Sequence, residues 1–177
     1  MQKHGQIVLI NGVCGVGKTT VSRSLCKRLK DKNFIRFDGD EYVIKHRIKP
    51  PESLSMADVG LWHVGFLKQP LAELLKNHNV ILSETFVLPI EAEFLSELQK
   101  SGSKIMHFVL DAERMTVVQR TLADREHAYA KDWRLKTYVL NMLGLRLNFP
   151  GAVHVATDGR TVDEIVLEIY GRITKRL

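Results

Sequence analysis

The chain of 177 residues has few cysteines, few prolines and no long apolar run. The two cysteines, Cys14 and Cys26, are too few for a disulfide framework, so we expect reduced thiols and a cytoplasmic protein. Apolar runs such as residues 6–10 and 80–82 are far shorter than the roughly 20 residues that cross a membrane. The first apolar stretch is also too short for the core of a secretory signal. We therefore expect a protein without a membrane association.

Basic tracts interleaved with aromatic residues are also absent, although 26 basic and 20 acidic residues give a net charge of +6. Recognition of nucleic acid needs a basic patch or stripe of that kind. A site for a polyphosphate would itself use several positive side chains. We therefore expect a small molecule, rather than nucleic acid, as the partner. The sequence carries no signal of an oligomeric state.

Short β-branched runs alternate with helical patterns along the whole chain. The pattern predicts strands at residues 6–10, 34–38, 80–83, 104–110 and 152–156. Val21, Leu25 and Leu29 recur every four residues and predict an amphipathic helix over residues 19–30. This alternation is typical of an α/β protein with a parallel sheet covered on both faces. With 45% hydrophobic residues and no linker, residues 1–177 are expected to form a single domain.

Several helix boundaries can also be predicted. Ser55 and Asp58 have the spacing of a helix N-cap, and a kink or a restart is expected at Pro70 within that helix. A long charged helical stretch follows the fourth strand and reaches about Leu147. Thr161 and Glu164 form a capping-box signature that opens the last helix.

A glycine-rich segment between the first strand and the first helix carries the most specific motif. Residues 12–19 read GVCGVGKT and match the pattern G-x-x-x-x-G-K-[ST] without a substitution. In this pattern, backbone N–H groups surround the β-phosphate, the lysine reaches the β- and γ-oxygens, and the threonine hydroxyl ligates magnesium. We therefore predict that ATP and Mg²⁺ are bound by Gly12, Val13, Cys14, Gly15, Val16, Gly17, Lys18, Thr19 and Thr20.

Acidic residues follow the second and third strands. Asp38 and Asp40 are separated by one glycine, and Glu84 comes directly after the third strand. Ligands of parallel α/β sheets bind beyond the carboxyl ends of the strands, where such carboxylates can hold magnesium or accept the proton of a hydroxyl. One of Asp38 and Asp40 could hold the metal while the other binds the acceptor and takes its proton, and Glu84 could hold magnesium or bind the substrate. An ordinary polar turn at residues 38–40 is the alternative.

The charged region at about residues 112–136 is predicted to form a helical lid. Arginines in a closing lid stabilise the charge that develops on a transferred phosphoryl group, and Arg120 and Arg125 are the first candidates, followed by Arg134. An exposed helix with internal ion pairs is the alternative reading of this region. Arg160, after the fifth strand, is a candidate for contact with adenine or simply part of a turn.

Together these residues resemble the small P-loop kinases of the nucleoside-monophosphate-kinase-like group. The turn at residues 38–40 is similar to that of gluconate and adenylylsulfate kinases, to the paired aspartates of shikimate kinases and to an aspartate of chloramphenicol phosphotransferases. Over most of the chain, the likeness is closest to tunicamycin-resistance ATP-binding proteins, through residues 10–12, 61–62, 107–108 and the segment from Arg120 to Trp133. The resemblance implies a three-layer P-loop NTPase fold with strand order 2-3-1-4-5. It also implies that Asp40 is the catalytic base or binds the acceptor, and that Asp38 lies near magnesium. The Asp-Gly-Phe-Pro-Arg signature of adenylate kinases is missing.

The sequence thus predicts an ATP- and Mg²⁺-dependent kinase that phosphorylates a hydroxyl of a small polar metabolite or antibiotic. Trp62 and His63, on the helix before the third strand, are expected to line the acceptor pocket, although a histidine on an apolar helix is commonly a packing residue. A nucleotide-dependent protein that sequesters its ligand without phosphoryl transfer is the alternative. The acceptor itself cannot be read from the sequence.

Overall fold

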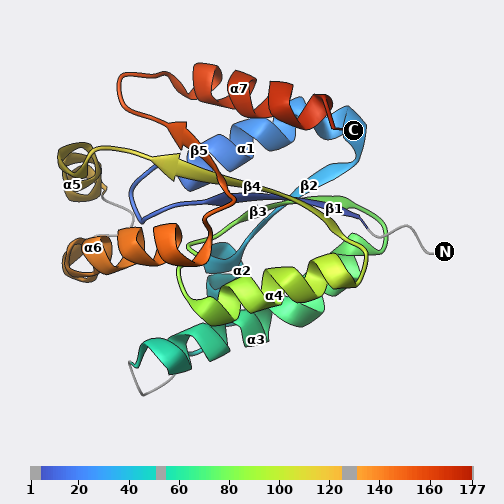
Figure 1. Ribbon diagram of the computed structural model, residues 1–177, viewed down its shortest axis with the longest axis horizontal. Helices are drawn as coiled ribbons and strands as arrows, with labels where there is room; N and C mark the ends of the chain where they lie inside the picture. Colours follow the sequence, from blue (N-terminus) through green and yellow to red (C-terminus); the bar gives the residue numbers. More distant parts are fainter. Residues whose placement is uncertain (1–4, 51–54, 125–130, 177) are drawn as a thin grey trace.

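The computed structural model describes residues 5–50, 55–124 and 131–176, which form a parallel sheet between two layers of helices (Figure 1). The sheet has the order β2-β3-β1-β4-β5, and every neighbouring pair of strands is parallel. The predicted fold class and strand order are therefore confirmed. The strands are β1 (Gln6–Asn11), β2 (Phe34–Asp38), β3 (Asn79–Ser83), β4 (Lys104–Asp111) and β5 (Val153–Ala156).

The helices cover both faces of this sheet. They are α1 (Lys18–Arg28), α2 (Gly39–His46), α3 (Met56–Leu75), α4 (Pro89–Lys100), α5 (Arg114–Ala123), α6 (Lys131–Asn148) and α7 (Val162–Thr174), with a short 3₁₀ turn at Lys30–Lys32. Helices α1 and α7 pack together on one face, and α3 and α4 pack together on the other. Helix α6 lies on the same side of the sheet as α4, next to the end of the sheet that carries the phosphate-binding motif (Figure 1).

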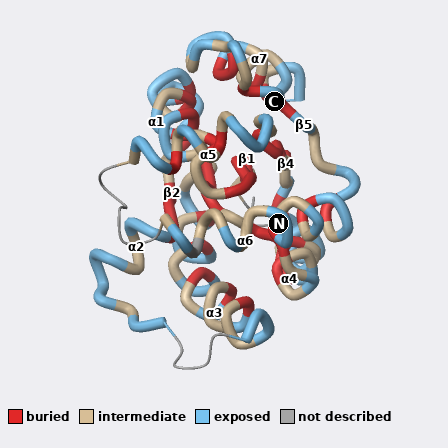
Figure 2. Tube along the Cα trace, turned by 90° about the vertical axis from the view of Figure 1, so that its left-hand side faces the viewer, coloured by how far each residue is buried: buried red, intermediate tan, exposed pale blue. Residues whose placement is uncertain are grey.

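The central strands form the core. Residues Ile7 to Ile10 of β1 and Val80 to Leu82 of β3 are fully buried, because helices cover both faces of a parallel sheet. Figure 2 shows buried positions along the strands and on the inner sides of the helices, whereas most of α2 is exposed. This rigid centre fixes the carboxyl ends of β1, β2 and β3 at one edge of the sheet.

The structure refines the predicted helices. Helix α2 starts directly at the acidic turn, a position to which no helix was assigned from the sequence. Helix α3 runs through Pro70 without the restart that was one of the two expectations there. The single helix expected after β4 is instead divided into α5, which ends before Asp124, and α6, which begins at Lys131. Within the described ranges, no helix combines the length and hydrophobicity needed to cross a bilayer.

Candidate active site

The loop between β1 and α1 has the conformation that an anion-binding loop requires. Gly12, Gly15 and Gly17 all have positive φ angles, of 144°, 84° and 107°, so side chains at these positions would strain the backbone. A Cβ on Gly15 would also lie 2.6 Å from Thr121 Oγ1, whereas Gly17 faces open space. Helix α1 begins at Lys18, so the positive end of its dipole points into the loop.

Two side chains of this loop carry groups that could hold a phosphate and a metal ion. Lys18 Nζ donates to the carbonyl oxygens of Gly12 at 3.0 Å and Val13 at 3.2 Å, which holds the ammonium group over the loop. Thr19 Oγ1 donates to Asp38 Oδ2 at 3.5 Å. This pair of oxygen ligands suits Mg²⁺. In the part of the chain that is described, no cluster of three or more His, Cys, Asp or Glu side chains could hold a metal ion.

Asp38 is buried at the end of β2 and is held from two sides. Its Oδ2 accepts a hydrogen bond from Arg36 Nη2 at 2.5 Å, and its Oδ1 accepts from the backbone N–H of Glu41 at 3.2 Å, which caps α2. Arg36 also pairs with the Glu41 carboxylate, and these hydrogen bonds outweigh burial and hold the pKa of Arg36 above its ordinary value. Sequence reasoning missed Arg36, although its place two residues before Asp38 on a strand puts both side chains on one face.

Asp40 and Glu84 face the same region from neighbouring elements. Asp40 is exposed in the first turn of α2, and Glu84 is only 5% exposed at the end of β3. The Glu84 carboxylate lies against Gly39, where an added Cβ would be 2.1 Å from Oε1. Burial raises the pKa of Glu84, His63 opposes this, and the charges of Asp40 and Asp38 raise it further. The three acidic residues predicted to act together are therefore brought to one place.

His63 on α3 bridges two buried carboxylates. Its Nε2 lies 2.9 Å from Glu84 Oε2, and its Nδ1 lies 2.6 Å from Glu91 Oε1. Since carboxylates only accept hydrogen bonds, a ring that donates from both nitrogens is an imidazolium. Burial alone would lower the pKa of His63, but the hydrogen bonds and charges of the two glutamates raise it to about 10. Glu91 was not predicted as a site residue, because a glutamate in the first turn of a helix is common in sequences.

Aromatic side chains from α2 and α3 lie beside this histidine. The Trp62 ring is 4.9 Å from Phe66, and Phe66 is 6.4 Å from Tyr42 in a stacked arrangement. The Trp62 indole Nε1 is buried, and no described residue accepts a hydrogen bond from it. A buried donor without a partner is rare in folded proteins. Trp62 and His63, which were predicted to line the pocket of the phosphate acceptor, thus belong to a group of ring side chains next to Glu84.

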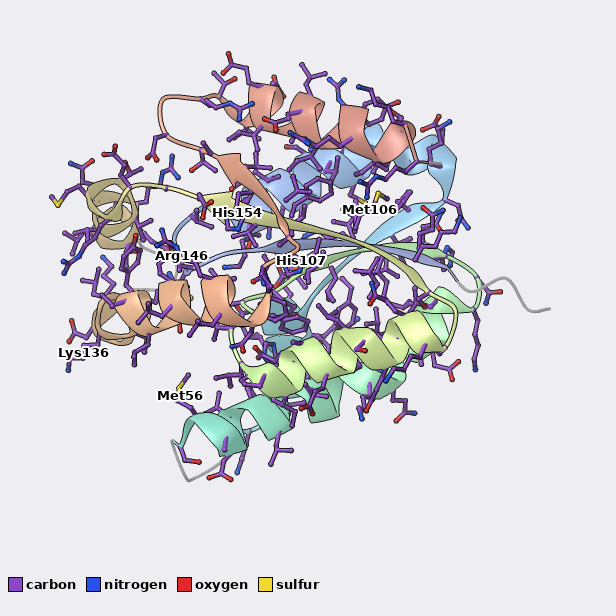
Figure 3. All side chains as sticks on the ribbon, in the orientation of Figure 1. Met56, Met106, His107, Lys136, Arg146 and His154 are labelled. Carbon is purple, nitrogen blue, oxygen red and sulfur yellow. The ribbon has the colours of Figure 1, made fainter. Side chains whose placement is uncertain are left out.

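A buried amide connects the phosphate loop to the strands on either side. Asn11 Oδ1 accepts from the backbone N–H groups of Gly12 and Phe86, and its Nδ2 donates to the Phe86 carbonyl oxygen. Nδ2 also lies 3.1 Å from His107 Nε2, which must therefore accept and carry no proton. In agreement, burial and the nearby charge of His154 lower the pKa of His107 to about 4 (Figure 3 labels both histidines, on β4 and β5).

The candidate arginines have different positions. Arg120 Nη1 donates to the Val16 carbonyl oxygen at 3.2 Å and to Thr157 Oγ1 at 3.1 Å, so it joins the phosphate loop to the loop after β5. Arg160 pairs with Glu168 at 2.9 Å and donates to the Ala156 and Glu164 carbonyl oxygens, so its guanidinium is used along α7. Arg125 lies outside the described residues. Arg134 pairs with Asp124 at 2.8 Å.

The parallel sheet, the glycine-rich loop and the lysine at the start of α1 define a P-loop nucleotide-binding protein. Residues 7–149 match the family model described as an AAA domain, and the chain therefore belongs to this family. It is 24% identical over 166 residues to a shikimate kinase of Persephonella marina, and the match covers 94% of this chain and 98% of the relative. It is 26% identical over 136 residues to an adenylyl-sulfate kinase of Chloroflexus aurantiacus, with 75% of this chain and 68% of the relative covered.

Solved structures agree with this assignment. The tunicamycin resistance protein of Deinococcus radiodurans superposes with a TM-score of 0.66 at 21% identity, covering 96% of this chain and 95% of that one. Together with the matches to a shikimate kinase and an adenylyl-sulfate kinase, this confirms the resemblance to small-molecule P-loop kinases that was inferred from the sequence.

Proposed function

We propose that the protein is an ATP- and Mg²⁺-dependent kinase that transfers the γ-phosphoryl group to a hydroxyl of a small polar molecule. The observation that carries the proposal is the convergence of Asp38, Asp40 and Glu84 opposite Lys18 and Thr19, at one edge of the sheet. A protein that only bound nucleotide would not need an exposed carboxylate next to Asp38 and Glu84. The curated relatives, a shikimate kinase and an adenylyl-sulfate kinase, both transfer phosphate to small molecules, which supports the same reaction here.

In this reaction the chain positions charges around the moving phosphoryl group. Loop N–H groups and Lys18 hold the phosphate oxygens, and the α1 dipole favours the same negative charge. When bound by Thr19 and Asp38, Mg²⁺ would neutralise charge on the phosphates. The oxygen of the acceptor hydroxyl bonds to the γ-phosphorus while Asp40 accepts the hydroxyl proton. The bond between the γ-phosphorus and the leaving ADP oxygen breaks.

The remaining predicted residues have supporting parts in this scheme. Segment 112–136 would act as the lid that brings arginines to the transferred phosphoryl group. Arg120, which donates to the Val16 carbonyl oxygen and to Thr157, would tie the loop after β5 to the phosphate loop. The whole chain would form one domain around this site.

The first test is ADP release from ATP and magnesium with a panel of hydroxylated acceptors: gluconate, shikimate, adenylylsulfate, nucleosides, chloramphenicol and tunicamycin. We expect one acceptor to stimulate release, and Asp40→Asn to lower kcat by about a hundredfold or more because the proton acceptor is lost. The affinity for ATP should change by less than about twofold, since Asp40 is proposed to contact the acceptor hydroxyl rather than the phosphates.

Two variants complete this test. Asp31→Asn removes an exposed carboxylate from the 3₁₀ turn far from the loop and should keep full turnover. Lys18→Ala should lower turnover by about a hundredfold or more through lost charge stabilisation. Tight ATP binding without stimulation by any acceptor would contradict the kinase and favour the sequestering protein. Full turnover in Asp40→Asn would remove Asp40 from the role of base.

A further inference from the structure

Glu84 has one oxygen that is bound and one that is not. Oε2 faces His63 Nε2 at 2.9 Å, whereas Oε1 is buried and receives no hydrogen bond from any residue that the structure describes. A buried carboxylate oxygen without a donor carries a desolvation penalty that nothing offsets. Such a group calls for an explanation, and a donor on a bound ligand is one.

The surroundings of Glu84 fix its orientation. His63 holds Oε2 and is itself held from behind by Glu91 at 2.6 Å. Glu91 uses its other oxygen, Oε2, to accept from the N–H groups of Val87 and Leu88 at the start of α4. Glu84 is therefore held by His63, His63 is held by Glu91, and Glu91 is held by the backbone. Oε1 is left against Gly39, between Asp38 and Asp40.

Charge restricts what Oε1 can bind. The groups that face it are the carboxylates of Asp38 and Asp40 from β2 and α2, and His63 from α3, with Glu91 of α4 behind the histidine. Arg36, the cation next to Asp38, is already paired with Asp38 and Glu41. An anionic group of the acceptor would be repelled at this point, whereas a neutral or cationic hydrogen-bond donor would be attracted.

We propose that Glu84 Oε1 accepts a hydrogen bond from a second hydroxyl or amino group of the acceptor, and that His63 and Glu91 are positioning residues that fix the Glu84 carboxylate for this contact. The inference rests on the proposed kinase reaction and names its substrate class. The acceptor is a diol or an amino alcohol, in which Asp40 takes the proton of one group and Glu84 binds the other.

Glu84→Gln tests the contact because its geometry is predictable. His63 Nε2 donates to the position of Oε2, so the amide oxygen of the glutamine must occupy that place. The amide NH₂ group then replaces Oε1 and cannot accept. Binding of the second donor is lost without a change of side-chain shape.

Kinetics with the acceptor that stimulates ADP release, and with its analogue that lacks the neighbouring hydroxyl or amine, measure this loss. We expect the wild type to prefer the complete acceptor over this analogue by about a hundredfold or more in kcat/KM. Sites that hydrogen-bond a hydroxyl or amino group of the substrate discriminate strongly against an analogue without it. Glu84→Gln should raise KM of the complete acceptor about tenfold and reduce the preference to within about threefold. KM for ATP should stay unchanged. Glu93→Gln, on the exposed side of α4, is the matched control.

The positioning role has a readout that does not need an acceptor. Nuclear magnetic resonance of the histidine side chains should show His63 protonated at both nitrogens at pH 8. Glu91→Gln should lower the titration midpoint of His63 by at least one pH unit. His63→Gln should raise KM of the acceptor more than it changes kcat.

The outcomes separate the inference from the kinase proposal. An unchanged acceptor KM and preference in Glu84→Gln, or a rise in KM for ATP and magnesium instead, would overturn the contact with the acceptor. A singly protonated His63 at pH 8 would overturn the positioning role. A doubly protonated His63 in a protein that no acceptor of the panel stimulates would count against the kinase, and would leave the orienting role of His63 and Glu91 standing.

Discussion

At the scale of single residues, the close contact between Gly39 and Glu84 predicts that a side chain at position 39 would disturb the site. A Cβ at position 39 would lie 2.1 Å from Glu84 Oε1, and Glu84 cannot move freely because His63 holds its other oxygen. We expect Gly39→Ala to displace the carboxylate and to raise the acceptor KM about tenfold or more, with ATP affinity retained. Steady-state kinetics and calorimetric ATP binding measure the two effects.

Gly65 provides the matched control for this substitution. It lies on the exposed face of α3 with nothing within 4 Å of an added Cβ. Gly65→Ala should leave turnover unchanged and raise the free energy of unfolding by about 0.5–1 kcal/mol, because alanine is the better helix former. Equal kinetics in Gly39→Ala and Gly65→Ala would show that the position of Glu84 does not matter for the acceptor.

The site residues differ in how visible they are in the sequence. Lys18, Thr19 and Asp38 belong to local motifs whose chemistry follows from their spacing, and the structure brings them together. Glu91 and Asn11 act through partners 28 and 75 residues away, and no spacing along the chain reveals such pairs. The difference is physical: a turn is fixed by neighbouring residues, whereas a buried polar network is fixed by the packing of separate elements.

At the scale of elements, the start of α7 allows a direct measurement. Thr161 Oγ1 accepts from the Glu164 N–H at 3.3 Å, and the Glu164 carboxylate accepts from the Thr161 N–H at 2.8 Å, which is the predicted capping box. Thr161→Ala should lower the free energy of unfolding by about 1 kcal/mol. Chemical denaturation gives this value, and Ser24→Ala, which removes a hydroxyl inside α1, should cause no loss. Equal effects of the two would mean that the cap does not stabilise α7.

Elements were predicted well where periodicity was local and less well at their junctions. Strand β2 has its predicted bounds, and β1, β3, β4 and β5 differ from theirs by one residue at one end. The break between α5 and α6 was missed, since charged residues with helical propensity continue across it. Helix α2 was missed because its start coincides with an Asp-Gly pair that is equally typical of a turn.

At the scale of the whole molecule, His107 makes the stability sensitive to acid. Its folded-state pKa of about 4 lies below the usual 6.5, so the unfolded chain binds more protons between these values. Above about pH 6.5, protonation of His107 does not lower the free energy of unfolding. Towards pH 4, the free energy of unfolding falls by up to about 1.4 kcal/mol per pH unit. His107→Gln should flatten this slope in urea denaturation, because its amide oxygen can still accept from Asn11. His78→Gln is the control, and an unchanged slope in His107→Gln would contradict the assignment.

The strand order has a consequence for how the chain is made. Strand β1 lies at the centre of the sheet, yet Ile7 pairs with Val80 on one side and with Ile105 on the other. During synthesis on the ribosome, the two edges of the first strand are therefore not both covered until about a hundred further residues have emerged. Such distant pairings make folding slow compared with that of helical proteins. In this interval an apolar segment with open edges is exposed, which is the state that chaperones bind.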